Sequence, residues 1–328
     1  MVILSHPLIK ILQLIDLIYV DNSPKKRTRG RPKLYSDLVM LKCFVVRTIK
    51  KITTMRGLYC FLSANPTIRD YCGLRKLPDR RTFDRRYKQF APSAEAQLRS
   101  LGLTLLLEGV VAPKIVATDS SLIKADGPVW HQEQKKEGII PAGLRNLDRE
   151  AEWGHSHYHG WIYGYKVHGS CTASGSVHIF TDATVTKGNA ADNMVYAQRI
   201  EFIPALTEDV LADTGFDDGK LFRSLEEKGK HLYVPIEASA STSPERLRWV
   251  ARCQSEDGKR KYKLREVSIE PLFGYIKELF DLEQLHVKGL GNGATEILLA
   301  FYAYDLIVLF NYLEGFPLGA VKNLLDII

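Results

Sequence analysis

Two aspartates end short apolar runs whose composition predicts buried strands. Asp119 ends the run IVATD (115–119), and Asp213 ends the run VLAD (210–213). If the two strands are neighbours in one sheet, the carboxylates lie side by side, and close carboxylates repel each other unless a proton or a cation lies between them. Carboxylate oxygens are hard ligands that favour Mg²⁺ or Mn²⁺. We therefore predict that Asp119 and Asp213 share a divalent-cation site, although acids at strand ends are also common in turns and caps.

A third carboxylate lies in the segment REVSIEPLFGYIKELF (265–280), whose apolar residues recur at helical spacing. We expect this helix to extend over 268–285, with Glu270 in its first turn, where the helix dipole favours an anion. Pro271 fits the first turn because its missing N–H would be unpaired there. Glu270 is therefore predicted as a third metal ligand, with Lys277 on the same face. A solvated helix face is the alternative interpretation of both residues.

The elements around these acids fall into two parts. The chain has 328 residues, of which 45% are hydrophobic and 25% charged, which is globular composition and long enough for two domains. Helical patterns dominate before residue 112, at 7–20, 37–51, 53–65 and 80–90. After it, the patterns predict strands at 114–125, 161–173, 176–186, 209–217 and 231–238, helices at 191–203, 219–229, 268–285 and 295–314, and a loop with at most one short helix at 237–260.

This order predicts an all-α N-terminal region over residues 1–111 and an α/β domain over residues 112–328. Three antiparallel strands that lead into alternating helices and strands, and then into terminal helices, indicate a mixed sheet of the RNase H-like kind, flanked by helices.

The cysteines and the apolar segments exclude several classes of protein. Five widely spaced cysteines without a C-x-x-C pair predict neither a disulfide framework nor a cysteine zinc site, so we expect a reducing, cytoplasmic location. An amphipathic helix, and not a signal peptide, is predicted at 7–20. The apolar segment 297–313 is short for a membrane span and contains Asp305 and Asn311. We expect a buried core helix there, and no membrane partner.

Basic residues are concentrated in the N-terminal region. The net charge is +7, and much of the excess lies in 25–33 and 75–88, which indicates a polyanionic partner, chiefly nucleic acid. In TRGRPK, Arg29 and Arg31 flank Gly30, and Pro32 follows, as in a minor-groove AT-hook. The same residues are equally consistent with a basic linker, 24–33, that only attracts phosphates.

A basic helix follows in RRTFDRRYKQF. Arg81, Arg85 and Lys88 recur at spacings of four and three residues and therefore share one helix face. We predict that this face contacts DNA phosphates, with a solvated face as the alternative.

Other polar residues compete for functional roles. His155, His157 and His159 in HSHYH would lie on one side of a strand and could bind zinc, but no fourth ligand is evident and a polar loop is favoured. Asp182 also follows an apolar strand and competes as a metal ligand. We expect ordinary structural roles for the others: sheet histidines at His168 and His178, and turn residues at Asp126, Asp217 and Asp218.

Four stretches together resemble one family, the DDE transposases of prokaryotic insertion sequences: VATDSSLIKA, GWIYGYKVH with VTKGNAADN, VLADTGFDD, and VSIEPLFGYIK. The resemblance covers most of 112–314 and, more weakly, 28–90. Asp213 follows Asp119 by 94 positions, and Glu270 follows Asp213 by 57, which suits members that lack a large insertion before the glutamate.

The resemblance implies an RNase H-like catalytic domain in which Asp119, Asp213 and Glu270 hold two Mg²⁺ or Mn²⁺ ions, and Lys277 contacts a DNA phosphate. It implies cutting at inverted-repeat ends and joining of those ends to target DNA, by a homodimer or larger assembly in the prokaryotic cytoplasm, at the nucleoid. The alternatives are an RNase H-like nuclease without strand transfer and a DNA-binding remnant without catalytic activity.

The sequence departs from the family pattern near the third acid. Members often have a tyrosine, an arginine three positions later, the glutamate four after that, and a lysine seven after that. Tyr262 and Arg265 both lie one residue early, and the expected arginine position is Glu266. Either the helix begins late and the preceding loop absorbs the shift, so that Arg265 still contacts DNA, or the arginine role is lost.

Overall fold

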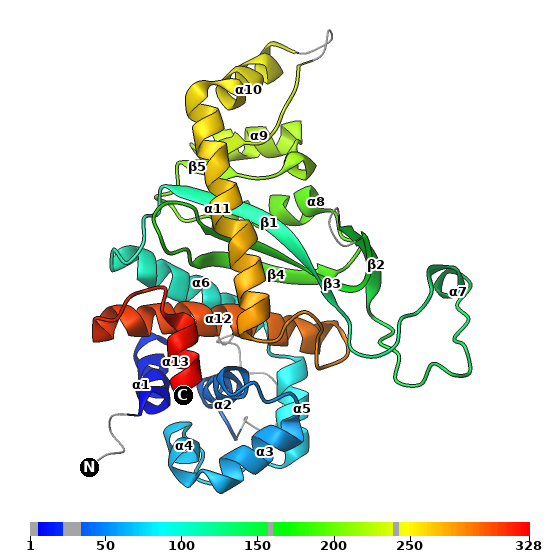
Figure 1. Ribbon diagram of the computed structural model, residues 1–328, viewed down its shortest axis with the longest axis vertical. Helices are drawn as coiled ribbons and strands as arrows, with labels where there is room; N and C mark the ends of the chain where they lie inside the picture. Colours follow the sequence, from blue (N-terminus) through cyan, green and yellow to red (C-terminus); the bar gives the residue numbers. More distant parts are fainter. Residues whose placement is uncertain (1–5, 22–33, 157–159, 239–242) are drawn as a thin grey trace.

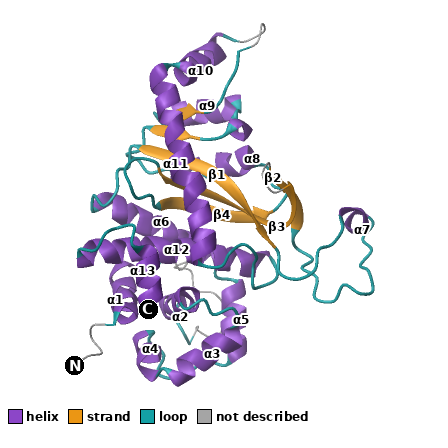
Figure 2. Ribbon diagram, viewed as in Figure 1, coloured by secondary structure: helices purple, strands orange, loops and turns teal. Residues whose placement is uncertain are grey.

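The computed structural model describes residues 6–21, 34–156, 160–238 and 243–328. In the described residues before 112, the regular elements are helices (Figures 1 and 2): α1 Pro7–Ile18, α2 Asp37–Ile49, α3 Met55–Ala64, α4 Pro66–Tyr71, α5 Arg80–Lys88 and α6 Ala91–Leu107. Side chains cap the starts of α2 and α5: Ser36 accepts the amide of Val39, and Asp79 accepts the amide of Arg81. The helical N-terminal region is thus confirmed.

Two of these helices, α4 and α6, are absent from our predictions. Helix α6 packs against the sheet through a close approach at Gly102, where an added Cβ would lie 2.7 Å from the carbonyl oxygen of Phe180. A mid-helix glycine weakens a helical pattern in the sequence, but here it allows the helix to reach the strand backbone.

The sheet contains six strands: β1 Ile115–Lys124, β2 Glu152–Ser156, β3 Gly160–Thr172, β4 Phe180–Lys187, β5 Asp209–Leu211 and β6 His231–Tyr233. Strand β3 is antiparallel to β1, β2 and β4, whereas β5 is parallel to both β1 and β6. The order β4-β3-β1-β5-β6, with three antiparallel strands followed by two parallel ones, confirms the predicted RNase H-like mixed sheet. Strand β2, which includes His155, was not predicted.

The helices after β1 are α7 Gln132–Lys136, α8 Asp192–Ala197, α9 Gly219–Glu226, α10 Pro244–Gln254, α11 Glu256–Leu279, α12 Leu290–Glu314 and α13 Val321–Ile327, with 3₁₀ turns at Ile200–Phe202 and Thr214–Phe216. The loop predicted at 237–260 is wrong over most of its length, because α10 and the start of α11 lie there. Ser243 and Ser255 cap these helices, so the serines mark helix starts.

Helix α11 begins 12 residues before the predicted start at 268. Glu270 therefore lies in the middle of the helix, and the first-turn explanation for Glu270 and Pro271 is wrong. Pro271 has no N–H to donate to the carbonyl of Val267. Burial lowers the pKa of His178, and the carbonyls of Thr172 and Val267 act against that shift.

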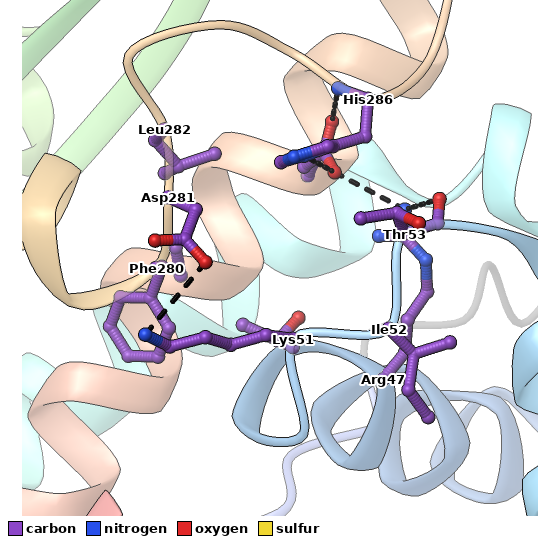
Figure 3. Close-up of a pocket in the computed structure, with 11 residues that line it drawn as sticks. Arg47, Lys51, Ile52, Thr53, Phe280, Asp281, Leu282 and His286 are labelled. Atoms are coloured by element: carbon purple, nitrogen blue, oxygen red, sulfur yellow. Dashed lines mark hydrogen bonds and ion pairs between the residues drawn. The ribbon is translucent and has the colours of Figure 1, made fainter.

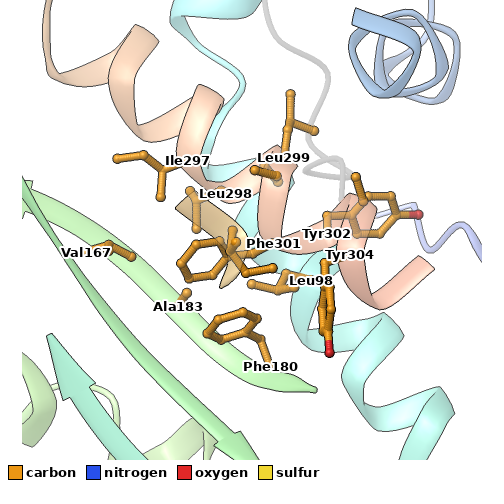
Figure 4. Packing of buried hydrophobic residues seen from close by; sticks show 14 of the residues in the cluster. Leu98, Val167, Phe180, Ala183, Ile297, Leu298, Leu299, Phe301, Tyr302 and Tyr304 are labelled. Carbon is orange, nitrogen blue, oxygen red and sulfur yellow. The ribbon is translucent and has the colours of Figure 1, made fainter. Parts of the chain in front are cut away.

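Helix α12 joins the two parts of the chain. It contacts α1, α2 and α5 on the N-terminal side and α6, β3 and β4 on the other. Phe301 of α12 stacks on Phe180 of β4 with ring centroids 4.0 Å apart, and Leu98 of α6 lies beside them (Figure 4). The helix is long and apolar enough to cross a membrane, but its most apolar window is 100% buried. The core helix predicted at 295–314 is confirmed.

A charged network crosses the junction between α2 and α12 (Figure 3). The guanidinium of Arg47 donates to Glu296 at 3.2 Å, to the hydroxyl of Tyr87 at 2.6 Å and to the carbonyl of Thr53 at 2.8 Å. Glu296 also accepts the backbone amide of His286 at 3.0 Å. Burial raises the pKa of Glu296, but the His286 hydrogen bond and the Arg47 charge outweigh it, so the pKa lies below its usual range.

We expect Glu296→Gln to destabilise the protein by about 3–5 kcal/mol at neutral pH, because it leaves the Arg47 charge buried without its counter-ion. Chemical denaturation measures this loss. The control is Glu314→Gln, which removes the exposed ion pair with Lys10 and should cost less than about 1 kcal/mol. Equal losses for the two variants would contradict the role of the buried network.

Candidate active site

Parallel pairing of β1 with β5 brings the two aspartates to neighbouring positions. Ala117 pairs with Leu211, and Asp119 and Asp213 each follow two residues later. Asp119 lies within β1, where its Cα partner on the other side is Gly169 of β3. Asp213 lies just beyond β5 and caps the next turn by accepting the amide of Gly215 at 2.9 Å. The strands that carry the two aspartates are therefore neighbours in the sheet, as predicted.

Helix α11 crosses β1, β3 and β5 and carries the third acid to the same place (Figure 1). The ring of Phe273 lies against Gly169, where an added Cβ would be 3.2 Å from the ring. A glycine opposite Asp119 thus lets the helix lie close to the sheet. Further along, the Lys277 ammonium donates to the carbonyl of Leu122 at 2.9 Å, which fixes the C-terminal half of α11 along β1.

A cleft of about 400 Å³ lies between α11 and the sheet. Asp119, Asp213, Glu270, Arg265 and Lys277 all line it, together with Lys166 and Asp192. Residues more than 150 positions apart in the chain therefore face one space. Their catalytic roles stay a prediction.

Arg265 lies between two of the acids. Its Nη1 donates to Oε1 of Glu270 at 2.6 Å, and its Nη2 donates to Oδ2 of Asp119 at 2.7 Å. The side chain of Arg265 is 8% exposed, that of Asp119 is 15% exposed and that of Glu270 is 41% exposed. Because α11 is continuous through this stretch, the late helix start that we considered is wrong, yet the guanidinium still reaches the acids.

Burial controls the protonation of the two aspartates. It raises the pKa of Asp119 to about 6, while the Arg265 charge and the Ser120 amide act in the opposite direction and the charges of Asp213 and Glu270 add to the rise. Burial also raises the pKa of Asp213, again opposed by Arg265. Five acids line the cleft, Asp119, Asp192, Asp213, Glu270 and Glu283, against three cations, Lys166, Arg265 and Lys277, so the cleft is short of positive charge.

The donor set suits a hard divalent cation, because three carboxylates with too little counter-charge line one cleft. Among the residues that the structure describes, however, no group of three or more His, Cys, Asp or Glu side chains is arranged to hold a metal ion. The guanidinium of Arg265 lies between Asp119 and Glu270 and donates to both.

Sequence reasoning missed two polar residues of the cleft. Lys166 of β3 donates to Asp192 at 3.2 Å and to the carbonyl of Ala190 at 2.9 Å. Asp192 lies at the start of α8, and its charge raises the pKa of Asp213. Both residues belong to stretches that carry the family resemblance, GYKVH and GNAADN, and that resemblance was the available signal.

Most of the competing candidates lie outside the cleft, although His155 lines it and His168 contacts the cleft residue Asp192 at 3.3 Å. Asp182 forms a bidentate pair with Arg199 at 2.6 and 2.7 Å and contacts Arg99, so it is neutralised away from the cleft. The others form local contacts: His168 with Thr186, Asp217 with Arg246, Asp126 with Lys288, and Asp218 as the cap of α9. His155 lines the cleft from β2, whereas His157 and His159 lie outside the described residues.

The predicted DNA-contacting residues differ in what the structure says of them. Arg81, Arg85 and Lys88 are exposed on α5. Arg29, Arg31 and the basic linker at 24–33 lie outside the described residues. Burial lowers the pKa of Lys277, whose ammonium is held by the Leu122 carbonyl within the cleft. Tyr262 of α11 is half-buried, and burial raises the pKa of its hydroxyl.

Comparison with known proteins gives two family matches. The model of the family "Transposase DDE domain" matches residues 112–306, and that of "Transposase domain (DUF772)" matches residues 1–89. No curated protein matches the chain. Among solved structures, a piggyBac transposase synaptic complex with hairpin DNA is similar at 9% identity, with a TM-score of 0.38, over 98% of this chain and 76% of that one. A Mos1 transposase paired-end complex with the left transposon end is similar at 11% identity, with a TM-score of 0.22, over 89% of this chain and 80% of that one.

We expect Asp119→Asn to become more stable relative to the wild type as the pH rises. The folded-state pKa of Asp119, about 6, lies above the ordinary aspartate value of 3.8. Its protonated form therefore contributes stability that is fully present below pH 3.8 and is lost as the pH rises through 6, a loss of about 3 kcal/mol. Denaturation of both proteins at pH 4.5 and pH 7.5 without divalent cations should show about 2 kcal/mol of this loss, and parallel pH profiles would contradict it.

Proposed function

Because this chain belongs to the transposase DDE-domain family, we propose that it cuts the ends of a prokaryotic insertion sequence and joins them to target DNA. The cleft between α11 and the sheet is the proposed active site. The observation that carries this proposal is the convergence of Asp119, Asp213 and Glu270 on that cleft.

In this proposal, Asp119, Asp213 and Glu270 hold two divalent ions, Mg²⁺ or Mn²⁺. Such an ion pair activates the attacking oxygen of water or of a DNA 3′-hydroxyl and stabilises the leaving oxygen of the phosphodiester. The protein supplies the rest by orientation. The β1–β5 pairing fixes the two aspartates, and the contacts of Phe273 with Gly169 and of Lys277 with Leu122 fix the helix that bears Glu270.

DNA is the proposed substrate, and two surfaces would bind it. Within the cleft, the Lys277 ammonium and the Arg265 guanidinium would contact a phosphate that lies over the acids. Away from it, the exposed face of Arg81, Arg85 and Lys88 would contact the backbone, with Arg29 and Arg31 as additional DNA contacts. Joining requires two ends at once, so at least two subunits would act together in the prokaryotic cytoplasm.

Removing a proposed metal ligand should abolish DNA cleavage but not DNA binding. We expect Asp119→Asn and Glu270→Gln each to lower the rate of Mg²⁺-dependent nicking of a labelled element end by more than the 10–100-fold that is typical of outer-shell partners. The matched control is Glu278→Gln, because Glu278 is an exposed residue on the same helix. This variant should nick DNA at the wild-type rate. DNA binding without nicking in any divalent ion would instead indicate a DNA-binding remnant.

Strand transfer distinguishes the proposed transposase from a nuclease. Purified protein, a labelled element end, Mg²⁺ and target DNA should yield a covalent product between end and target, because the same site can direct a DNA 3′-hydroxyl as well as water. Gel electrophoresis detects this product. Cut ends without it would favour the RNase H-like nuclease.

The basic face of α5 can be tested by its salt dependence. We expect Arg81→Ala and Arg85→Ala each to weaken DNA binding at every sequence and to reduce the slope of log K against log salt by about 1. Asp84→Ala on the same helix is the control that removes no cation, and it should not reduce the slope. An unchanged slope in both arginine variants would indicate a solvated face.

A further inference from the structure

The cleft contains a positive charge in direct contact with two of the proposed metal ligands. Arg265 is 7% exposed and forms short ion pairs with Asp119 and Glu270 through separate nitrogens. Its third nitrogen, Nε, is buried without a hydrogen-bond partner. The guanidinium is thus aimed at the acids and only partly satisfied by them.

We propose that Arg265 acts as an internal counter-ion that competes with the divalent cation for Asp119 and Glu270, and that a DNA phosphate draws it away. The inference rests on the proposed function and concerns how metal binding and DNA binding are coupled. Arg265 is a positioning residue in this scheme, since it acts through the carboxylates.

Charge and geometry support the competition. A carboxylate oxygen that accepts a guanidinium N–H at 2.6–2.7 Å cannot offer the same lone pair to a cation, and two positive groups at one position repel each other. The second oxygen of Asp119 already accepts the Ser120 amide at 2.8 Å, and a cation on the second oxygen of either acid would lie close to the guanidinium charge. A cation that binds Asp119 and Glu270 therefore competes with Arg265. Displacement without a new partner would leave a charge in a largely buried position, which is costly.

A DNA phosphate supplies that new partner. Guanidinium groups bind phosphate oxygens with the same bidentate geometry that they use for carboxylates, and Glu270 is at the open side of the cleft, with 41% of its side chain exposed. DNA bound over the acids can therefore accept Arg265 while the cation takes its place. Because binding free energies are reciprocal, DNA should tighten metal binding and metal should tighten DNA binding.

The test measures Mn²⁺ affinity by titration calorimetry for the wild type, Arg265→Gln and Arg265→Lys, with and without DNA. The DNA is a pre-cut element end with a 3′-deoxy terminus, so that no joining occurs. Binding that Asp119→Asn removes defines the specific site. The matched control is Arg246→Gln, which removes a bidentate pair with Asp217 outside this cleft. Circular dichroism establishes that each variant is folded.

Without DNA, Arg265→Gln should bind Mn²⁺ at least about tenfold more tightly than the wild type, because the competitor is gone. DNA should tighten Mn²⁺ binding by the wild type within the usual 5–150-fold range of coupling, and by Arg265→Gln much less. Arg265→Lys keeps the charge but lacks the planar guanidinium, so its Mn²⁺ affinity should lie between those of the wild type and Arg265→Gln. Arg246→Gln should match the wild type.

Equal or weaker Mn²⁺ affinity in Arg265→Gln, without DNA, overturns the inference, as does undiminished coupling to DNA in that variant. The proposed function has a separate readout, the nicking that Asp119→Asn should abolish. If the protein nicks DNA in an Asp119-dependent way but Arg265→Gln leaves its Mn²⁺ affinity unchanged, the proposed function stands and the inference about Arg265 is wrong.

Discussion

Carboxylates that share a largely buried cleft repel each other, and positive charge must lie among them. The sheet creates this condition, because parallel pairing of β1 with β5 sets Asp119 beside Asp213. Helix α11 adds both Glu270 and the arginine that partly neutralises the group. The position of Arg265 and the suitability of the cleft for a divalent cation follow from this electrostatic constraint, whereas the elevated pKa of Asp119 comes first from burial and only then from the neighbouring acids.

Helix α11 meets the constraint because it is held at several points along its length. Near its start, Lys261 forms an ion pair with the buried Asp209 at 2.8 Å. In its middle, Phe273 rests on Gly169, and near its end, Lys277 binds the Leu122 carbonyl. A helix fixed at three places cannot rotate, so Glu270 and Arg265 face the aspartates although they are five residues apart.

The predictions succeeded where local pattern determines structure and failed where tertiary contacts decide. Apolar runs that end in an acid correctly predicted the strands of Asp119 and Asp213, and the order of strands and helices correctly predicted a mixed sheet. The segment 237–260 was misjudged because serine and proline mark helix starts as well as loops. The early position of Arg265 suggested a lost role, since helical spacing describes Cα positions, whereas a long flexible side chain reaches a partner five residues away. No local signal pointed to Lys166 or Asp192.

Helix α12 has a consequence for how this protein can evolve. One face of it completes the core of the N-terminal helices, and another completes the core of the sheet, with a single apolar cluster running through both. A chimera that exchanged the N-terminal helices for those of a distant relative would place foreign side chains against α12 and against the buried Arg47–Glu296 pair. Exchange of the whole N-terminal module would therefore disturb the core, whereas substitutions on the exposed face of α5 would leave these buried contacts intact.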